Sequence, residues 1–111
     1  MPKKVLELDF EPVNDVMVVG RLGSDASEYE RPSGDVVVNC RVLVPRADGR
    51  VDTLDCAVEG AALRKKVLSW QAGDVIELQG SLHRRFWNGP TGPVSRYEIG
   101  VATAKRLKRA A

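Results

Sequence analysis

The chain has few of the residues on which catalytic and metal sites depend. Its 111 residues include two cysteines and a single histidine, His83, which are too few for a zinc cluster or a disulfide scaffold. No serine lies in a nucleophile-elbow pattern, and the ten glycines form neither a phosphate-binding loop nor a dinucleotide fingerprint. We therefore expect a protein that is not an enzyme, with no catalytic residues, no metal and no cofactor.

Long apolar segments are also missing. No run approaches the roughly 18 consecutive apolar residues that span a bilayer. The opening Met-Pro-Lys-Lys is followed by alternating charge, where a signal peptide has an apolar core. We expect a soluble, cytoplasmic protein with no membrane partner. The net charge of +2 is too small to indicate a nucleic-acid binder, so the distribution of the charges has to decide that question.

Five segments in which apolar residues, many of them valine, alternate with polar ones predict β-strands. Their bounds are 14–23, 35–45, 50–60, 74–87 and 95–105. After the third segment, Leu63, Val67 and Trp70 recur at helical spacing and predict a helix that ends on Gly73. The order of three strands, a helix and two strands is typical of an OB-fold. The predicted fold class is all-β with one helix: a five-stranded Greek-key barrel with the helix between strands 3 and 4.

The length of the chain favours one domain. We assign residues 14–105 to the barrel, residues 106–111 to a short basic tail, and residues 1–13 to an N-terminal extension. From Leu6 to Phe10 apolar and acidic residues alternate in this extension. That pattern fits either a short extra strand or a frayed leader.

The second and third predicted strands form a hairpin whose register follows from the turn between them. A turn centred on Asp48 pairs residues whose numbers sum to 96, so Cys40 faces Cys56 on the apolar side. We expect two reduced thiols in the core; a cross-strand disulfide is geometrically feasible but disfavoured in a reducing cytoplasm. On the opposite side Arg41 faces Asp55. Such a cross-strand pair of opposite charges supports the register by roughly 0.2 to 1 kcal/mol.

Three stretches carry a family resemblance through their order and spacing. They are N-D-V-M-V-V-G-R-L-G-S-D at 14–25, R-P-S-G-D-V-V-V-N-C-R-V at 31–42 and D-V-I-E-L-Q-G-S-L-H-R-R-F-W at 74–87. With them the chain, from Asn14 to about Ala104, resembles the bacterial single-stranded DNA-binding protein family. The resemblance implies an OB-fold that forms a homotetramer, or less often a dimer. It also implies sequence-independent binding of single-stranded DNA in replication, recombination and repair, and a nucleoid-associated location in the cytoplasm.

The resemblance also implies which residues bind DNA. Trp87 matches a tryptophan that the family has at the base of the loop between the last two strands, and Arg85 matches a basic position beside it. Four further residues are expected to add to the DNA-binding surface: Arg84, Tyr97, Arg96 and Arg41. The alternative for the segment around Trp87 is an amphipathic hairpin whose rings pack on the barrel. Phe86, on the other face of a regular strand from Trp87, is expected in the core, and Trp70 is expected to cap the barrel.

Several aromatic positions of the family are missing from this chain. Asp48, Thr53 and Glu59 stand where the family has rings, and Asp55 replaces a basic residue. Single-stranded DNA-binding OB-folds are themselves the proteins for which stacking is worth roughly 1 to 3 kcal/mol per base. The loss of three rings would therefore remove several kcal/mol of binding.

Two main hypotheses of function remain open. The chain either binds single-stranded DNA weakly through a reduced aromatic surface, or it is an OB-fold protein-interaction module that has lost most DNA binding. An RNA-binding module is a third option, because the scaffold does not distinguish the two nucleic acids. The family's acidic C-terminal tail has no counterpart in the basic ending K-R-L-K-R-A-A. We therefore expect no recruitment through such a tail, unless the sequence is a piece of a longer protein.

Overall fold

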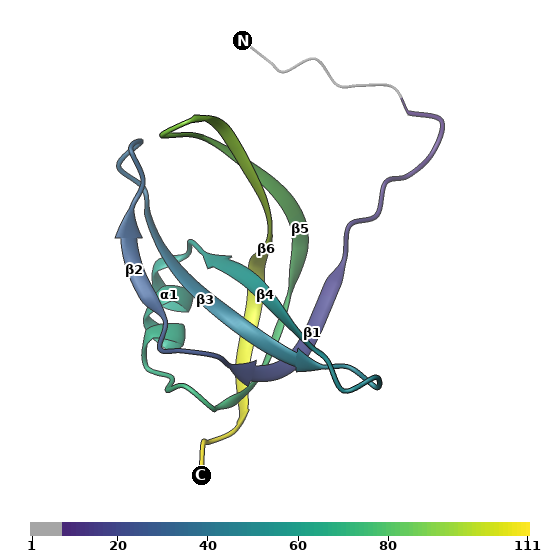
Figure 1. Ribbon diagram of the computed structural model, residues 1–111, viewed down its shortest axis with the longest axis vertical. Coiled ribbons are helices and arrows are strands. Elements are labelled where there is room, and N and C mark those ends of the chain that lie inside the picture. Colours follow the sequence, from purple (N-terminus) through teal and green to yellow (C-terminus); the bar gives the residue numbers. More distant parts are fainter. Residues whose placement is uncertain (1–7) are drawn as a thin grey trace.

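Six strands and one helix follow one another along residues 8–111, the part of the chain that the computed structural model describes (Figure 1). The elements are β1 (Val16–Leu22), β2 (Ser27–Glu30), β3 (Val36–Pro45), β4 (Val51–Val58), α1 (Ala61–Leu68), β5 (Val75–Gly89) and β6 (Gly92–Lys108).

Five of the strands close into a ring. The hydrogen-bonded order is β1-β5-β6-β4-β3, and the end of β1 pairs with β3 and closes the barrel. The pairing of β4 with β6 is parallel, whereas the other pairings are antiparallel. The short strand β2 adds to the outer edge of β3. This ring with one helix confirms the predicted OB-fold.

The strand β2 and the end of the helix differ from the sequence-based expectation. β2 is only four residues long, Ser-Glu-Tyr-Glu, and contains none of the valine alternation that predicts the other strands. The helix lies between β4 and β5, which correspond to the third and fourth predicted strands. The numbers differ by one because β2 was not predicted. The helix ends at Leu68, before Gly73. Trp70 follows the helix and is buried in the core, as predicted for a residue that caps the barrel.

The predicted register of the β3–β4 hairpin is confirmed. Cys40 pairs with Cys56, and Arg41 pairs with Asp55. Both cysteines are free thiols in the core. A hydrogen bond with Cys40, together with burial, raises the pKa of Cys56 far above its usual range, so this side chain is a neutral thiol.

The core fills the inside of the ring and is closed at one end by the helix. Val67 is the buried residue of α1, and it packs with Trp70 against the inward side chains of the strands. Twelve buried residues form this cluster: Leu22, Val38, Cys40, Val42, Cys56, Val58, Val67, Trp70, Ile76, Leu78, Ile99 and Ala104. Each large aliphatic side chain contributes roughly 1.5 to 3 kcal/mol by leaving water.

The two ends of the barrel are formed by the start of β1 and the end of β6. The possible strand from Leu6 to Phe10 lies partly outside the described residues, and its described part, from Leu8 onward, has no regular structure. Asn14 instead fixes the chain just before β1, because its side-chain amide exchanges two hydrogen bonds with the backbone of Leu82. At the other end β6 continues to Lys108, and two residues of the predicted basic tail, Arg106 and Lys108, pair with Ile76 and Val75 of β5.

Gly80 lies where the pairing of β5 with β6 shifts its register. A Cβ atom at this position would lie 1.9 Å from the carbonyl oxygen of Gly100. We predict that Gly80→Ala lowers the free energy of unfolding by about 1 to 3 kcal/mol in urea denaturation, because the two strands must move apart. Gly60→Ala is the control in open space: its nearest neighbouring atom would be 3.9 Å away, and we expect a loss below about 1 kcal/mol, which comes from its position as the N-cap of α1. Equal stability of the two variants would contradict this packing.

Asp74 joins the start of β5 to the end of the chain. Its carboxylate accepts hydrogen bonds from the backbone N–H groups of Gln71 and Ala110, and Arg106 lies 3.6 Å away. The two backbone hydrogen bonds are the main reason that the pKa of Asp74 is lowered, and Arg106 adds to the effect.

A group whose pKa is lowered by folding stabilises the protein above its unfolded pKa, about 3.9 for aspartate, and loses that effect as the pH falls through the folded value. We therefore predict that Asp74→Asn lowers the melting temperature at pH 6 and that the difference from the wild-type chain shrinks as the pH approaches 3. Thermal unfolding across this range measures the effect. A difference that does not change with pH would rule out an ionised Asp74 as its cause.

Candidate nucleic-acid interface

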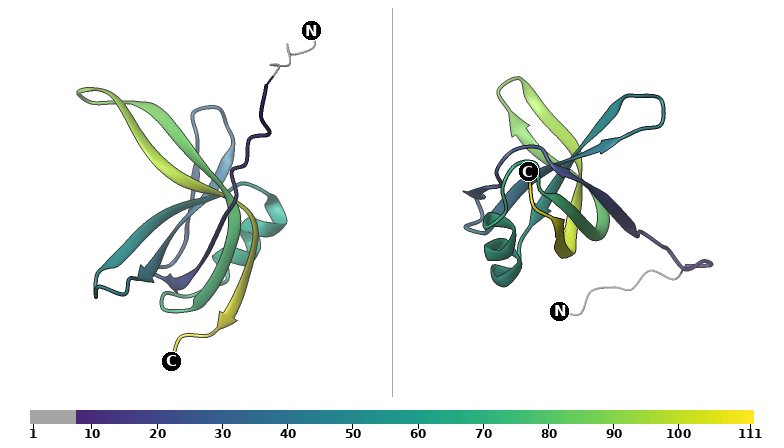
Figure 2. Two further views of the ribbon diagram at one scale, coloured as in Figure 1. Left: turned by 90° about the vertical axis from the view of Figure 1, so that its right-hand side faces the viewer. Right: turned by 90° about the horizontal axis from the view of Figure 1, so that it is seen from below.

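The β5–β6 hairpin extends beyond the barrel and carries most of the predicted site residues. Both views in Figure 2 show it projecting in a different direction from the β3–β4 hairpin. Its strands stay paired from Leu82 opposite Ile99 to Gly89 opposite Gly92, so that only Pro90 and Thr91 form the turn. Trp87 pairs with Val94 and therefore lies near the tip of the hairpin. The prediction that Trp87 stands at the base of a loop is wrong, because pairing continues through the segment expected to be that loop.

One face of this hairpin carries Trp87, Arg85 and Arg96, and we call it the groove face. Arg85 pairs with Arg96 across the strands, and both guanidinium groups lie near the indole. The centre of the Arg85 guanidinium is 4.9 Å from the centroid of the Trp87 ring, and that of Arg96 is 6.0 Å away. These distances fit cation–π contacts. The structure thus brings together three of the six predicted residues.

The opposite face carries Arg84 and Tyr97, which are directly paired across the strands. Successive side chains of a strand point to opposite sides, so Arg84 and Arg85 cannot share a face. The structure therefore separates Arg84 and Tyr97 from the patch around Trp87 that we expected them to complete. Phe86 lies on this second face too, but 66% of it is exposed, so the prediction that it belongs to the core is wrong.

The sixth predicted residue, Arg41, lies on β3 and reaches the groove face through a shared carboxylate. Its Nε atom is 3.1 Å from Asp55, and the other oxygen of Asp55 is 3.6 Å from Arg96. The expected ion pair between Arg41 and Asp55 is confirmed. Asp55 also binds an arginine of the groove face, which the pairing of β3 with β4 alone does not predict.

Tyr29 on β2 completes the groove face, and sequence reasoning missed it. Arg85 donates a hydrogen bond of 2.6 Å to the Tyr29 hydroxyl, and its guanidinium lies 6.0 Å from the centroid of that ring. Arg85 is thus in contact with two aromatic rings, Tyr29 and Trp87. The signal in the sequence is slight, because Tyr29 is the single aromatic residue in a strand of four residues.

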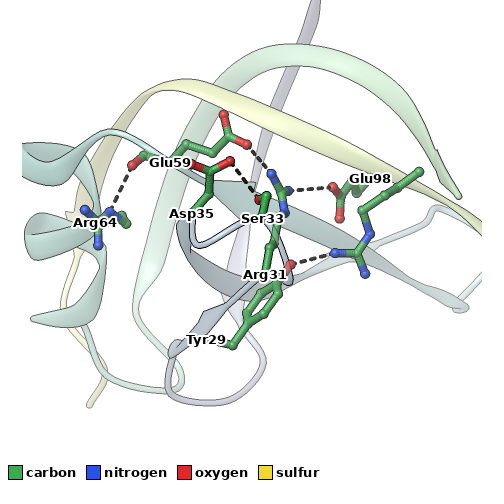
Figure 3. A network of polar contacts seen from close by, with 8 residues as sticks. Tyr29, Arg31, Ser33, Asp35, Glu59, Arg64 and Glu98 are labelled. Carbon is green, nitrogen blue, oxygen red and sulfur yellow. Dashed lines mark hydrogen bonds and ion pairs between the residues drawn. The ribbon is translucent and has the colours of Figure 1, made fainter. Parts of the chain in front are cut away.

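A network of charges lies beside Tyr29 (Figure 3). Arg31 donates a 2.5 Å hydrogen bond to Glu59 and lies 3.8 Å from Glu98, a carboxylate that is almost fully buried. Burial is the largest single effect and by itself would lower the pKa of Arg31, but the hydrogen bonds and charges of Glu59 and Tyr29 together outweigh it, and the pKa is raised. Arg64 donates to the backbone carbonyl of Glu59 and fixes the end of β4.

A groove of about 1220 Å³ runs between β2 and the hairpin. Its walls include the two rings and the charged network, and they also include two residues whose side chains point to the other face of the hairpin, Arg84 and Phe86. His83 also lines it and hydrogen-bonds the Ser81 hydroxyl at 2.7 Å. The groove thus offers flat rings and guanidinium groups, which are the two features that bind the bases and phosphates of a single strand.

The described residues contain neither a cluster of metal ligands nor a membrane-spanning helix. Across residues 8–111, no three His, Cys, Asp or Glu side chains gather closely enough to hold a metal ion. The helix α1, the sole helix in that range, is too short to cross a bilayer.

The comparisons with known proteins agree with this geometry. A family model described as the single-strand binding protein family matches residues 13–107. Among solved structures, one described as "Plasmodium falciparum SSB complex with ssDNA" superposes with a TM-score of 0.74 at 20% sequence identity. The match covers 91% of this chain and 100% of that chain. No curated protein matches the chain.

Proposed function

Because the chain belongs to the single-strand binding protein family, we propose that it binds single-stranded DNA, without sequence preference, on the groove face of the β5–β6 hairpin. The observation that carries this proposal is the contact of Arg85 with both Trp87 and Tyr29 at the wall of an open groove. Bases stack on the rings of such a site and phosphates follow its cations. The processes it serves, on this proposal, are DNA replication, recombination and repair, in the cytoplasm and at the nucleoid.

The stacking surface of this chain is small. Thr53 is exposed on β4 and offers no ring, and Glu59 is occupied by its bond with Arg31. Asp48 bonds the backbone of Arg50 in the β3–β4 turn. With fewer stacking contacts, a larger share of the binding free energy comes from phosphates and is lost at high salt.

We further propose that the chain forms a homo-oligomer, either a tetramer or a dimer, through the outward face of β1. Met17 is 63% exposed there, and Val19 beside it is 44% exposed. Large apolar side chains side by side on a strand favour contact with another protein surface. The mass of the chain in solution measures the number of copies.

A second candidate function is an OB-fold module that binds another protein and has lost most DNA binding. It is favoured by Asp55, which pairs with both Arg41 and Arg96 and so occupies two cations that phosphates would otherwise contact. Two results together would favour this function over DNA binding. They are the recovery of a stable protein partner without nucleic acid and the absence of oligo-dT binding at low salt.

The titration of labelled oligo-dT, followed by fluorescence anisotropy at low and physiological salt, tests the DNA-binding proposal. We predict that Trp87→Ala weakens binding by roughly 1 to 3 kcal/mol, because one stacking ring is removed. Thr53→Ala, on the neighbouring strand β4, is the control and should bind like the wild-type chain.

Arg85→Glu should abolish binding at physiological salt, since it removes the cation beside both rings. Unchanged affinity in both Trp87→Ala and Arg85→Glu would place the site elsewhere.

Asp55→Thr should strengthen the binding of oligo-dT. The substitution frees Arg41 and Arg96 for phosphates, and each new contact should steepen the plot of log K against log salt by about 0.7. Asp52→Thr is the matched control, because Asp52 lies on the same strand but pairs with Arg46, so that its loss frees neither Arg41 nor Arg96. Equal affinities and salt slopes for the two variants would show that DNA does not reach Arg41 and Arg96.

A further inference from the structure

The side chains of the hairpin that point away from Trp87 form a second cluster of rings and charge, which adjoins the groove because Arg84 and Phe86 also line its wall. We call it the back-face platform and define it as Arg84, Phe86 and Tyr97. The guanidinium centre of Arg84 lies 4.9 Å from the centroid of the Phe86 ring and 5.6 Å from that of Tyr97. The Ser95 hydroxyl accepts two hydrogen bonds from Arg84, at 2.9 and 3.1 Å. The guanidinium is therefore held in place between the two rings.

These rings do not serve the core. Phe86 is 66% exposed and Tyr97 is 60% exposed, whereas Trp87 on the groove face is 37% exposed. An aromatic ring that packs on the barrel would be covered. The platform thus has more open aromatic surface than the groove face.

The charge of the platform also differs from that of the groove face. Within the described part of the chain, no carboxylate lies within 4.0 Å of Arg84. The groove-side arginines Arg31 and Arg96, in contrast, are each within that distance of a carboxylate. A fixed guanidinium with no anionic partner, set between two open rings, suits a ligand that has both flat faces and negative charge. Unpaired nucleotides have both.

A single strand can pass from one face of the hairpin to the other. β1 pairs with β5 only as far as Gly80, and β4 pairs with β6 only at Ile99 and Gly100. Nearer the tip, and among residues 8–111, no further β-strand pairs with either edge of the hairpin. No β-strand therefore lies between Trp87 and the platform.

We propose that the back-face platform is a second site for single-stranded DNA, at which bases stack on Phe86 and Tyr97 while Arg84 binds a phosphate. Single-stranded DNA that occupies the groove would continue around an edge of the hairpin and contact both faces. This inference rests on the proposed DNA-binding function, and it adds a second contact surface to the same ligand.

The dependence of affinity on oligomer length tests this proposal in the full chain. The double variant Phe86→Ala/Tyr97→Ala should bind a long oligo-dT at least roughly tenfold more weakly than the wild-type chain, because two stacking contacts are removed. Tyr97→Ala alone, at a residue that does not line the groove, should bind the shortest oligomer that still quenches Trp87 as the wild-type chain does. Phe10→Ala is the matched control, because Phe10 is 64% exposed and lies outside the hairpin.

A fluorescent reporter places the bases directly. In a Trp87→Phe background the remaining tryptophan, Trp70, is buried in the core, so the added substitution Tyr97→Trp puts the responsive indole on the platform. We expect long oligo-dT to quench its emission. The shortest oligomer, which fills only the groove, should leave that emission unchanged. Circular dichroism of each variant checks that the barrel is intact.

The outcomes separate this inference from the function on which it rests. If oligo-dT does not bind the wild-type chain even at low salt, the proposed function is wrong and the second site is wrong with it. If Trp87 is quenched but the platform reporter is not, and the double variant keeps its affinity for every length, the second site alone is wrong. A double variant with a smaller mass in solution and unchanged DNA affinity would show that the platform contacts another copy of the chain, which also overturns the inference.

Discussion

Continuous pairing of β5 with β6 up to a two-residue turn is the constraint on which the candidate site depends. It keeps the segment beyond the barrel in regular strands, where neighbouring side chains must point to opposite faces. Arg84 and Phe86 are thereby separated from Arg85 and Trp87, although the four are consecutive in the sequence. What reads as one aromatic and basic cluster becomes two surfaces, and the groove face is completed by Tyr29 from a distant strand.

The charges of the groove face explain why net charge says so little about function here. Arg31, Arg41 and Arg96 are each close to a carboxylate, so that much of the positive charge in and beside the groove is balanced within the protein. Ion pairs between exposed side chains are worth only about 0 to 1 kcal/mol, and a phosphate can therefore take the place of the carboxylate at small cost. A surface of this kind gives weak binding that responds strongly to salt.

The barrel could be predicted from the sequence because its signals are local. The alternation of apolar and polar residues predicted five of the six strands directly, and the turn around Asp48 predicted the pairing of Cys40 with Cys56, which the structure confirms. The strand β2 could not be predicted, since four residues with one ring carry no periodic signal. The groove face depends on β2 and on how far β5 and β6 pair beyond the barrel. Both are long-range properties, and they decide where Tyr29, Arg31 and Arg84 lie.

Photo-crosslinking of the full chain to oligo-dT that carries bromodeoxyuridine, with identification of the modified peptides, shows whether single-stranded DNA binds along the β5–β6 hairpin. We predict crosslinks at Trp87 on the groove face and at Phe86 or Tyr97 on the other face. Crosslinks confined to β1, α1 or the β3–β4 turn would contradict it.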